Sequence, residues 1–267
     1  MKQFEQAIVR IPCDRFPEGI TPGSLGKADV ASARKQHQAY IETLKACGVK
    51  VTVLEAENDF PDSCFVEDPA IVTDRVAIIT RFGAASRSGE TPLILPAITA
   101  VYGDHIETIQ APGTVEGGDI CQVGEHFFIG LSLRTNDEGA RQLGEILKKY
   151  GFTSSTIDIR KYKTVLHLKT GMSYLGNDTF IVMPEIMDEP ELKKYTKLVV
   201  TPEESYAANC IRVNDFVIIP AGFTNAIAQV EGAGFKTLPL EMSEFRKQDG
   251  GLSCLSLRIP ELHFASQ

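Results

Sequence analysis

The sequence lacks several features that would place the protein in other classes. No apolar stretch approaches the ~18 residues that a membrane-spanning helix needs, so no membrane segment is expected. No run rich in Lys and Arg is present and the formal net charge is −8, which argues against a nucleic-acid partner. The first residues, Met1–Glu5, lack the apolar core of a signal peptide.

The cysteines also exclude a common kind of site. The chain has 6 of them, spread along its length, and no Cys-x-x-Cys pair occurs. This distribution is typical of a reduced, cytoplasmic protein and argues against a structural zinc site. No low-complexity linker divides the chain, so we expect one domain over residues 1–267.

What the sequence does contain is a degenerate repeat of paired β-type runs. Each copy joins two apolar or β-branched runs through a short turn rich in Gly, Asn or Asp, which predicts a hairpin. The copies span residues 68–79, 119–129, 173–182 and 209–219. A fifth run, Ser253–Leu257, has no partner after it, and we expect the N-terminal run Gln6–Arg10 to pair with it and close a ring.

Helix-like segments separate these hairpins. They are expected over Asp29–Cys47, Thr135–Tyr150, Asn225–Val230 and Glu241–Lys247. Pro92 and Pro96 should limit the segment after Ser88 to short pieces of helix. Hairpins that alternate with helices predict an α/β protein built as a radial repeat of ββα-type units, with an ordinary mixed α/β sheet as the alternative.

In a radial repeat the first residue of every hairpin faces the axis. In this chain those residues are polar or nucleophilic, namely Asp68, Asp119, Ser173, Asn209 and the pair Ser253–Cys254. An acidic cavity is costly to desolvate unless it holds a cation or many donors. The pattern therefore predicts a small cationic ligand at the axis.

Three residues suggest covalent catalysis. Cys254 follows a Gly-Gly turn and is the candidate nucleophile, although most free cysteines are buried small hydrophobes. His167 alternates out of a predicted strand and is the candidate general acid/base, with an ordinary core or surface histidine as the alternative. Glu116, in a turn with two glycines, could orient His167, although such a run is usually a surface turn.

Further charged residues suggest how a ligand is held. Glu67 and Asp68 are adjacent, so only one of them can point squarely at a ligand unless the backbone bends. Arg87 and Arg134 each follow the second strand of a hairpin, and arginine suits bidentate capture of a carboxylate. Two such arginines beside an acidic pocket indicate a zwitterionic ligand with a cationic end, whereas unrelated surface charges are the alternative.

Several motifs, taken in order along the chain, resemble the dimethylarginine dimethylaminohydrolases of the guanidine-modifying amidinotransferase superfamily. They are Cys64–Asp68, Ile79–Arg87, Glu116–Asp119, Gly130–Asn136, Leu166–Lys169 and Gly251–Cys254. The resemblance implies a five-bladed α/β propeller with a central active site, which agrees with the repeat count. It also implies hydrolysis of Nω-methylated arginine to citrulline, without metal or cofactor. A homodimer is compatible with it, although the sequence does not set the oligomeric state.

The resemblance further implies a role for each matching residue. Cys254 would attack the guanidinium carbon, His167 would protonate the departing amine and then activate water, and Glu116 would orient His167. The residues implied to bind substrate are Asp68 and Glu67 at the guanidinium, Arg87 and Arg134 at the α-carboxylate, and Asp62, Ile20 and Gln248 at the α-amine, the last two through backbone carbonyls.

Two alternatives to this activity are a different reaction of the same superfamily and a non-catalytic amino-acid binder. Arginine deiminases usually carry an aspartate two residues after the histidine, where this chain has Lys169. The absence of that acid favours methylated arginine over arginine or citrulline as substrate. The intact set of Cys254, His167 and Glu116 argues against a binder, which needs no nucleophile.

Overall fold

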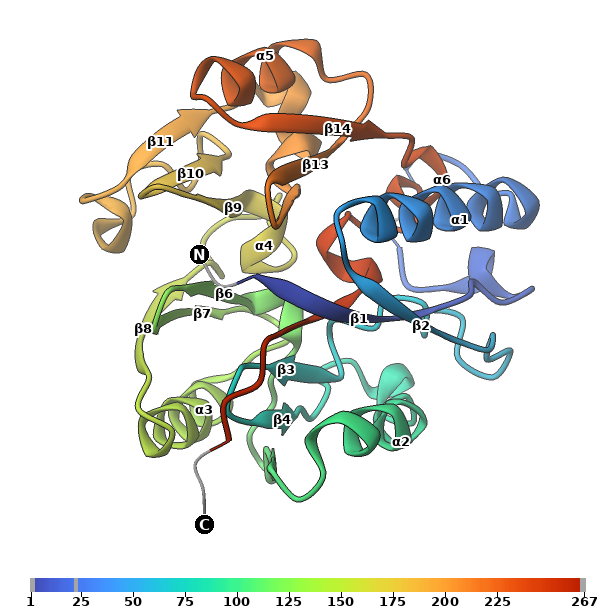
Figure 1. Cartoon of the computed structure of the whole chain (residues 1–267), viewed down its shortest axis with the longest axis vertical. Helices are drawn as coiled ribbons and strands as arrows, with labels where there is room; N and C mark the ends of the chain where they lie inside the picture. The colour runs from blue at the N-terminus through green and yellow to red at the C-terminus, as the bar shows by residue number, and fades with distance from the viewer. Residues whose placement is uncertain (1–2, 22–23, 265–267) are drawn as a thin grey trace.

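The strands of this chain form five sheets of three strands each, arranged around the middle of the molecule in the computed structural model (Figure 1). The structure describes residues 3–21 and 24–264. In sheet order, the strands are β15 (Leu257–Pro260), β1 (Phe4–Arg10) and β2 (Lys50–Leu54); β3 (Ala70–Val72), β4 (Ala77–Ile79) and β5 (Ile106–Thr108); β6 (Ile120–Val123), β7 (His126–Leu131) and β8 (Thr153–Asp158); β9 (Met172–Gly176), β10 (Thr179–Val182) and β11 (Thr196–Val199); β12 (Ile211–Val213), β13 (Phe216–Pro220) and β14 (Lys236–Leu240). The predicted five-bladed α/β propeller is confirmed.

All five blades follow one plan. The first two strands of each sheet are antiparallel, and the third is parallel to the second. A parallel neighbour requires a crossover connection, which four blades make with the helices α1 (Val30–Ala46), α2 (Thr91–Tyr102), α3 (Asp137–Lys149) and α5 (Thr224–Gly232). The remaining blade, that of β9, β10 and β11, makes the connection with a loop that contains the 3₁₀ turn Pro190–Leu192. The unit is thus ββαβ, and the predicted ββα pattern missed its last strand.

The ring is closed by the two ends of the chain, as predicted. β1 pairs antiparallel with β15, with Ala7 opposite Arg258 and Ile8 opposite Leu257. The blade that carries Cys254 is therefore the one whose strands are furthest apart in the sequence.

The helices are close to their predicted ranges except near Pro96. The carboxylate of Asp29 caps α1 by accepting the Ser32 N–H at 2.8 Å, as its position predicts. α2 runs without a break through Pro96, contrary to the prediction of short pieces. Ile94, Ile98 and Tyr102 form a buried face on this helix, and that packing offsets the backbone hydrogen bond that proline removes.

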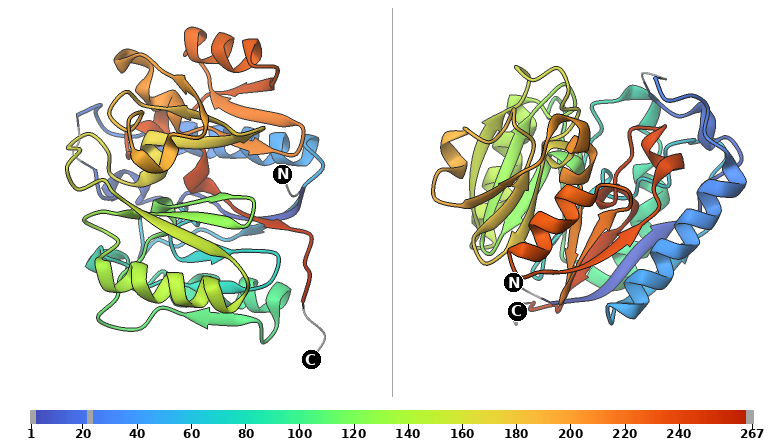
Figure 2. Two further views of the ribbon diagram at one scale, coloured as in Figure 1. Left: turned by 90° about the vertical axis from the view of Figure 1, so that its left-hand side faces the viewer. Right: turned by 90° about the horizontal axis from the view of Figure 1, so that it is seen from above.

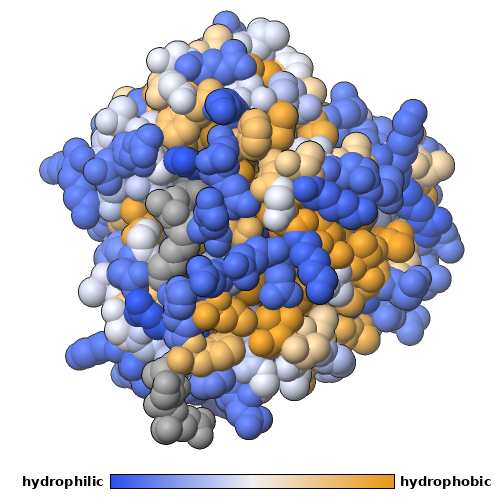
Figure 3. Space-filling model, in the orientation of Figure 1, coloured by the Kyte–Doolittle hydropathy of each residue, from blue (hydrophilic) through white to orange (hydrophobic). Residues whose placement is uncertain are grey.

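The crossover helices α1, α2, α3 and α5 lie on the outside of the ring, whereas the short helix α4 (Leu168–Gly171) lies nearer its middle (Figures 1 and 2). Hydrophilic side chains cover most of the face seen in Figure 3, beside an apolar area to the right of its centre. Exposed large hydrophobic side chains include Val53 of β2 and Leu95 of α2. Among the described residues, no helix is long and apolar enough to span a bilayer.

Candidate active site

One pocket collects most of the residues that the sequence singled out. Its lining includes Cys254, His167, Asp68, Asp62, Arg87, Arg134, Ile20 and Gln248. These residues come from six separate parts of the chain and meet only because the blades form a ring. Glu116 lies behind His167, whereas the Glu67 side chain lines a different cavity.

Cys254 lies in a 3₁₀ turn, Ser253–Leu255, and not in the strand that its sequence predicted. The strand β15 begins three residues later, at Leu257. The glycine at 251 is required here, because a Cβ atom at that position would lie 2.3 Å from Cγ of Asn209. Burial raises the pKa of the Cys254 thiol to about 12, and the nearby carboxylates of Glu67 and Asp68 act in the same direction.

His167 also differs from its predicted setting. It is the N-cap of a short helix, α4 (Leu168–Gly171), and not part of a strand. Its Nε2 lies 2.8 Å from Oε2 of Glu116. The next residue, Leu168, donates its backbone N–H to Asp119 at 3.0 Å, so the start of the helix is fixed from the neighbouring blade. His167 is thus fixed both by the hydrogen bond at its ring and by the one at the backbone of the next residue.

Glu116 is a fully buried carboxylate with several donors. Oε1 accepts the backbone N–H groups of Gly83 and Ala84 at 3.1 and 3.0 Å, and Arg134 Nη1 lies 3.5 Å away. Burial raises the pKa of Glu116, but the hydrogen bond from His167 and the nearby positive charges leave it below its usual value. The group is therefore an anion that can orient an imidazole and stabilise its protonated form.

The charges around His167 favour imidazolium. Burial alone lowers the pKa of His167, but the carboxylates of Asp68 and Asp119 and the hydrogen bond to Glu116 raise it to about 9. At neutral pH in the absence of a ligand, the pocket therefore contains a protonated imidazole and a protonated thiol.

Asp68 is a buried acid with a carboxylate oxygen within 4.8 Å of a ring nitrogen of His167. Its Oδ2 accepts from Arg87 Nη1 at 2.6 Å and its Oδ1 accepts the Gly118 N–H at 2.9 Å. Burial raises the pKa of Asp68, but Arg87 and His167 together hold it below its usual value. Gly118 allows the close approach, because a Cβ there would lie 2.8 Å from the His167 ring and 3.0 Å from Oδ1 of Asp68.

Arg87 is more constrained than its predicted role suggested, because it pairs with an acid that sequence reasoning missed. Glu90 takes its Nε and Nη2 donors at 2.9 and 2.7 Å, and Phe65 O accepts from Nη2 at 3.1 Å. Asp68 accepts one of the two Nη1 N–H groups. The contacts of the described residues therefore leave one N–H of Arg87 available to a ligand. The i,i+3 spacing of Arg87 and Glu90 is the signal that could have revealed this pair.

The remaining predicted residues that line the pocket are Asp62, Ile20, Gln248 and Arg134. Asp62 accepts the Ile20 N–H with both carboxylate oxygens, at 3.2 and 3.1 Å. The hydrogen bond described at Ile20 is therefore made by its N–H, whereas the prediction concerned its carbonyl oxygen. Gln248 is buried, and its Oε1 has no hydrogen-bond partner among the described residues. Arg134 is more exposed than Arg87, with 15% of its side chain accessible against 7%.

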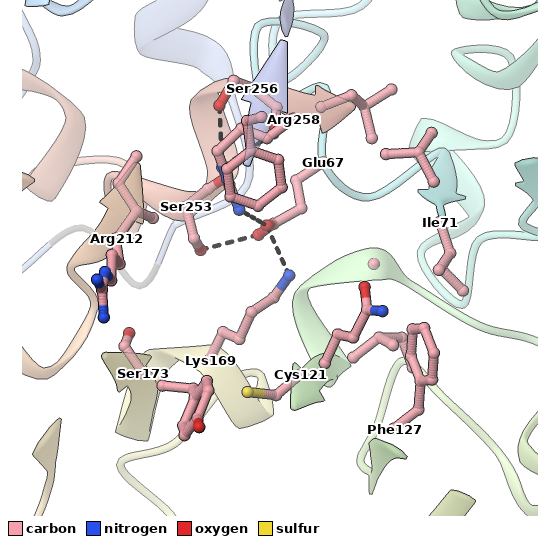
Figure 4. Close-up of a pocket in the computed structure, with 18 of the residues that line it drawn as sticks. Glu67, Ile71, Cys121, Phe127, Lys169, Ser173, Arg212, Ser253, Ser256 and Arg258 are labelled. Carbon is pink, nitrogen blue, oxygen red and sulfur yellow. Dashed lines mark hydrogen bonds and ion pairs between the residues drawn. The ribbon is translucent and has the colours of Figure 1, made fainter. Parts of the chain in front are cut away.

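Glu67 and Lys169 line a cavity other than the pocket that holds Cys254. The Glu67 carboxylate accepts from Lys169 Nζ at 2.6 Å and from Arg258 Nη2 at 3.2 Å, and all three line a second cavity of about 160 Å³ (Figure 4). Lys169 does not line the pocket of Cys254. Since adjacent residues diverge, Asp68 reaches the pocket and Glu67 does not.

Asp68, Glu116 and His167 each place one possible ligand atom within 4.8 Å of the others. The imidazole donates directly to Glu116, and Asp68 already accepts from Arg87 and Gly118. The cluster is thus accounted for as a network of charged hydrogen bonds that fixes one imidazole.

Known proteins share this architecture across the chain. A family model described as arginine deiminase matches residues 56–232. The chain is 47% identical to the dimethylarginine dimethylaminohydrolase of Pseudomonas aeruginosa, over 96% of this chain and 100% of that protein. It is 33% identical to that of Streptomyces coelicolor, over 97% of this chain and 98% of that protein. A solved structure of the Pseudomonas enzyme, a cysteine-to-serine variant in complex with citrulline, has a TM-score of 0.94 and 46% identity, and covers 96% of this chain and 100% of that one. The chain therefore belongs to the dimethylarginine dimethylaminohydrolase family, as its motifs predicted.

Proposed function

We propose that this chain hydrolyses Nω-methylated arginine to citrulline and methylamine or dimethylamine through a covalent intermediate on Cys254. The observation that carries the proposal is the meeting of Cys254, His167 and Asp68 in one pocket, with Glu116 bonded to the imidazole from behind. A thiol, an acid/base and an acceptor for a cation are the groups that attack on a guanidinium requires.

The first step depends on the substrate itself. With a thiol pKa of about 12, very little thiolate exists in the empty pocket at neutral pH. A guanidinium bound beside the sulfur adds a positive charge there, which lowers the thiol pKa. The thiolate then adds to the guanidinium carbon, and Asp68 is the carboxylate that accepts N–H groups of the substrate and keeps it oriented.

His167 serves both halves of the reaction. As imidazolium it donates a proton to the departing amine, which leaves Cys254 joined to the carbon as a thiouronium. The neutral imidazole then takes a proton from water, and the resulting hydroxide attacks the same carbon. The thiolate leaves and takes up the proton of the added hydroxyl, so that citrulline and the free thiol form. Glu116 holds the ring in one orientation throughout and stabilises the charged form.

Glu116→Gln should lower kcat by about 10²-fold, the scale of general acid–base catalysis. The substitution removes the carboxylate charge and weakens the hydrogen bond, so the pKa of His167 should fall from about 9. Activity should then be lost at a lower pH on the alkaline side, because imidazolium is needed to protonate the amine. The pH dependence of kcat and an NMR titration of the imidazole measure both effects. Glu145→Gln, the same change on an exposed helix, is the control, and an unshifted alkaline limb in Glu116→Gln would contradict the role.

The other end of the substrate would be held near the mouth of the pocket. Arg134 and the remaining Nη1 N–H of Arg87 suit the α-carboxylate, and Asp62, Gln248 and the backbone at Ile20 suit the α-ammonium. Agmatine, which lacks the carboxylate, should therefore be a poor substrate.

Competition kinetics on a panel of guanidines test the proposed function. Monomethylarginine and asymmetric dimethylarginine should have a kcat/KM at least about 10-fold above that of arginine. Glu67 is bound to Lys169 and Arg258 outside the pocket, so its carboxylate does not accept N–H groups of a guanidinium there. Unmethylated arginine would therefore leave N–H donors unpaired, and each unpaired donor costs about 1–3 kcal/mol. Arginine or citrulline as the preferred substrate would instead assign the chain to another reaction of the superfamily. The cytoplasmic location and the homodimer remain predictions, which localisation and sedimentation measurements test.

A further inference from the structure

Ser253, the residue before the nucleophile, is held at all three of its polar groups. Its backbone N–H donates to Asn209 Oδ1 at 3.0 Å, and its Oγ donates to Glu67 Oε2 at 2.8 Å. Its carbonyl oxygen accepts from Arg258 Nη1 at 3.1 Å. Asn209 and Glu67 come from distant parts of the sequence, whereas Arg258 lies in the strand that follows, and Ser253 is only 2% exposed. A residue fixed in this way leaves the backbone of Cys254 little freedom to move.

Glu67 is the centre of these contacts, as Figure 4 shows. Besides the bond from Ser253, its carboxylate accepts from Lys169 and Arg258. Its own backbone N–H donates to the carbonyl oxygen of Cys254 at 3.2 Å. A single residue therefore bonds both to the nucleophile's backbone and to the residue before it.

The position of the Glu67 carboxylate separates two possible roles. A guanidinium acceptor would have to line the pocket that holds Cys254, but the Glu67 side chain lines the second cavity, on the other side of the Ser253 turn. Two cations and a hydroxyl already donate to it, and a substrate would have to compete with both ion pairs. Both observations indicate that Glu67 supports other residues of the site and does not bind the substrate directly.

We infer that Glu67, together with Arg258, is a positioning residue that holds the Ser253–Cys254 turn so that the thiol is aimed at the substrate carbon. The inference rests on the proposed function for the reaction it serves. Because covalent attack requires near-contact geometry, a small displacement of the nucleophile lowers the rate of the chemical step without weakening substrate binding.

Steady-state kinetics of Glu67→Gln, Ser253→Ala and the surface control Glu145→Gln test this inference. Glu67→Gln should lower kcat by about 10- to 100-fold and leave KM within about threefold, since misplacement by about 1 Å can cost 10²-fold. Ser253→Ala removes one contact of the turn and should lower kcat in the same way by a smaller factor. It keeps the test available if Glu67→Gln folds poorly. Glu145→Gln changes an exposed helical carboxylate and should leave both parameters unchanged.

Alkylation of the thiol by iodoacetamide as a function of pH gives a second readout. Glu67→Gln removes a nearby negative charge, so its thiol should react faster at neutral pH although its turnover is slower. Ser253→Ala removes no charge and should keep the wild-type pH dependence. A rise in KM of tenfold or more in Glu67→Gln with kcat unchanged would make Glu67 a substrate acceptor and overturn the inference. So would a kcat within twofold of wild type in both variants.

Failure of the proposed function would look different. If the wild-type chain does not hydrolyse methylated arginine, the proposed reaction is wrong, and the same variants are then assayed on the substrate that the guanidine panel identifies. If the wild type turns over and the variants behave as substrate-binding mutants, only the positioning role fails.

Discussion

Replacing Cys254 with serine should lower kcat by at least about 10⁴-fold while the fold is kept. A hydroxyl is far harder to ionise than a thiol. The carboxylates of Glu67 and Asp68 already disfavour a thiolate at this position, and they would disfavour an alkoxide in the same way. Serine is close to cysteine in size, so the turn and its contacts through Ser253 should remain. Assays of citrulline release and circular dichroism measure activity and fold.

Cys47→Ser is the matched control, because Cys47 is buried outside both cavities. It should keep near-normal turnover. Mass spectrometry of the wild type treated with a haloacetamidine should place the label on the peptide that contains Cys254. A label on Cys64, or a Cys254→Ser variant with near-normal turnover, would show that another residue attacks the substrate.

Arg87→Met should lower the free energy of unfolding by about 3–5 kcal/mol, the cost of breaking a buried ion pair on one side. Methionine fills the space but leaves the buried carboxylates of Asp68 and Glu90 without their guanidinium. Burial already raises the pKa of Glu90 to about 7, and loss of Arg87 should raise it further. Since the folded variant then binds more protons than the unfolded chain, its stability should fall as pH rises. Urea unfolding at several pH values between about 6 and 8 measures this slope.

Arg134→Met is the informative comparison. Arg134 lies 3.5 Å from Glu116 and is more accessible than Arg87, so its loss should act mainly on KM. The expected cost is about 1.5–3 kcal/mol in substrate binding, the scale of a hydrogen bond to a charged group. If both variants lose substrate affinity equally and neither loses stability, the two arginines share one role at the substrate carboxylate.

The repeat was predictable from sequence because each hairpin carries its own turn signal. The turns at Gly124 and Asn214 adopt the positive φ that such residues favour, and the runs around them are mostly apolar or β-branched. The closing pair of β1 and β15 followed from an unpaired last run. The third strand of each blade was missed because it follows a long crossover connection and belongs to no hairpin; β2, for example, has no buried residue.

The site was predictable as a set of residues but not as a geometry. Sequence indicated Cys254, His167 and Asp68, yet placed the first two in strands and gave Glu67 the same task as Asp68. The side on which each acid lies depends on the bend of the loop before β3, which no local pattern encodes. Glu90 was missed because its i,i+3 spacing from Arg87 does not by itself show that the pair is buried.

The pairing of β1 with β15 has a consequence for the order of events during synthesis. In the blade next to the nucleophile, β1 is made before all the other strands, and the strand it pairs with, Leu257–Pro260, is made after every other blade. Until then the edge of β1 is open, and Arg258 has not yet reached Ser253 and Glu67. The reactive thiol and Arg258, which supports it, are therefore made together, after the strands of the other four blades.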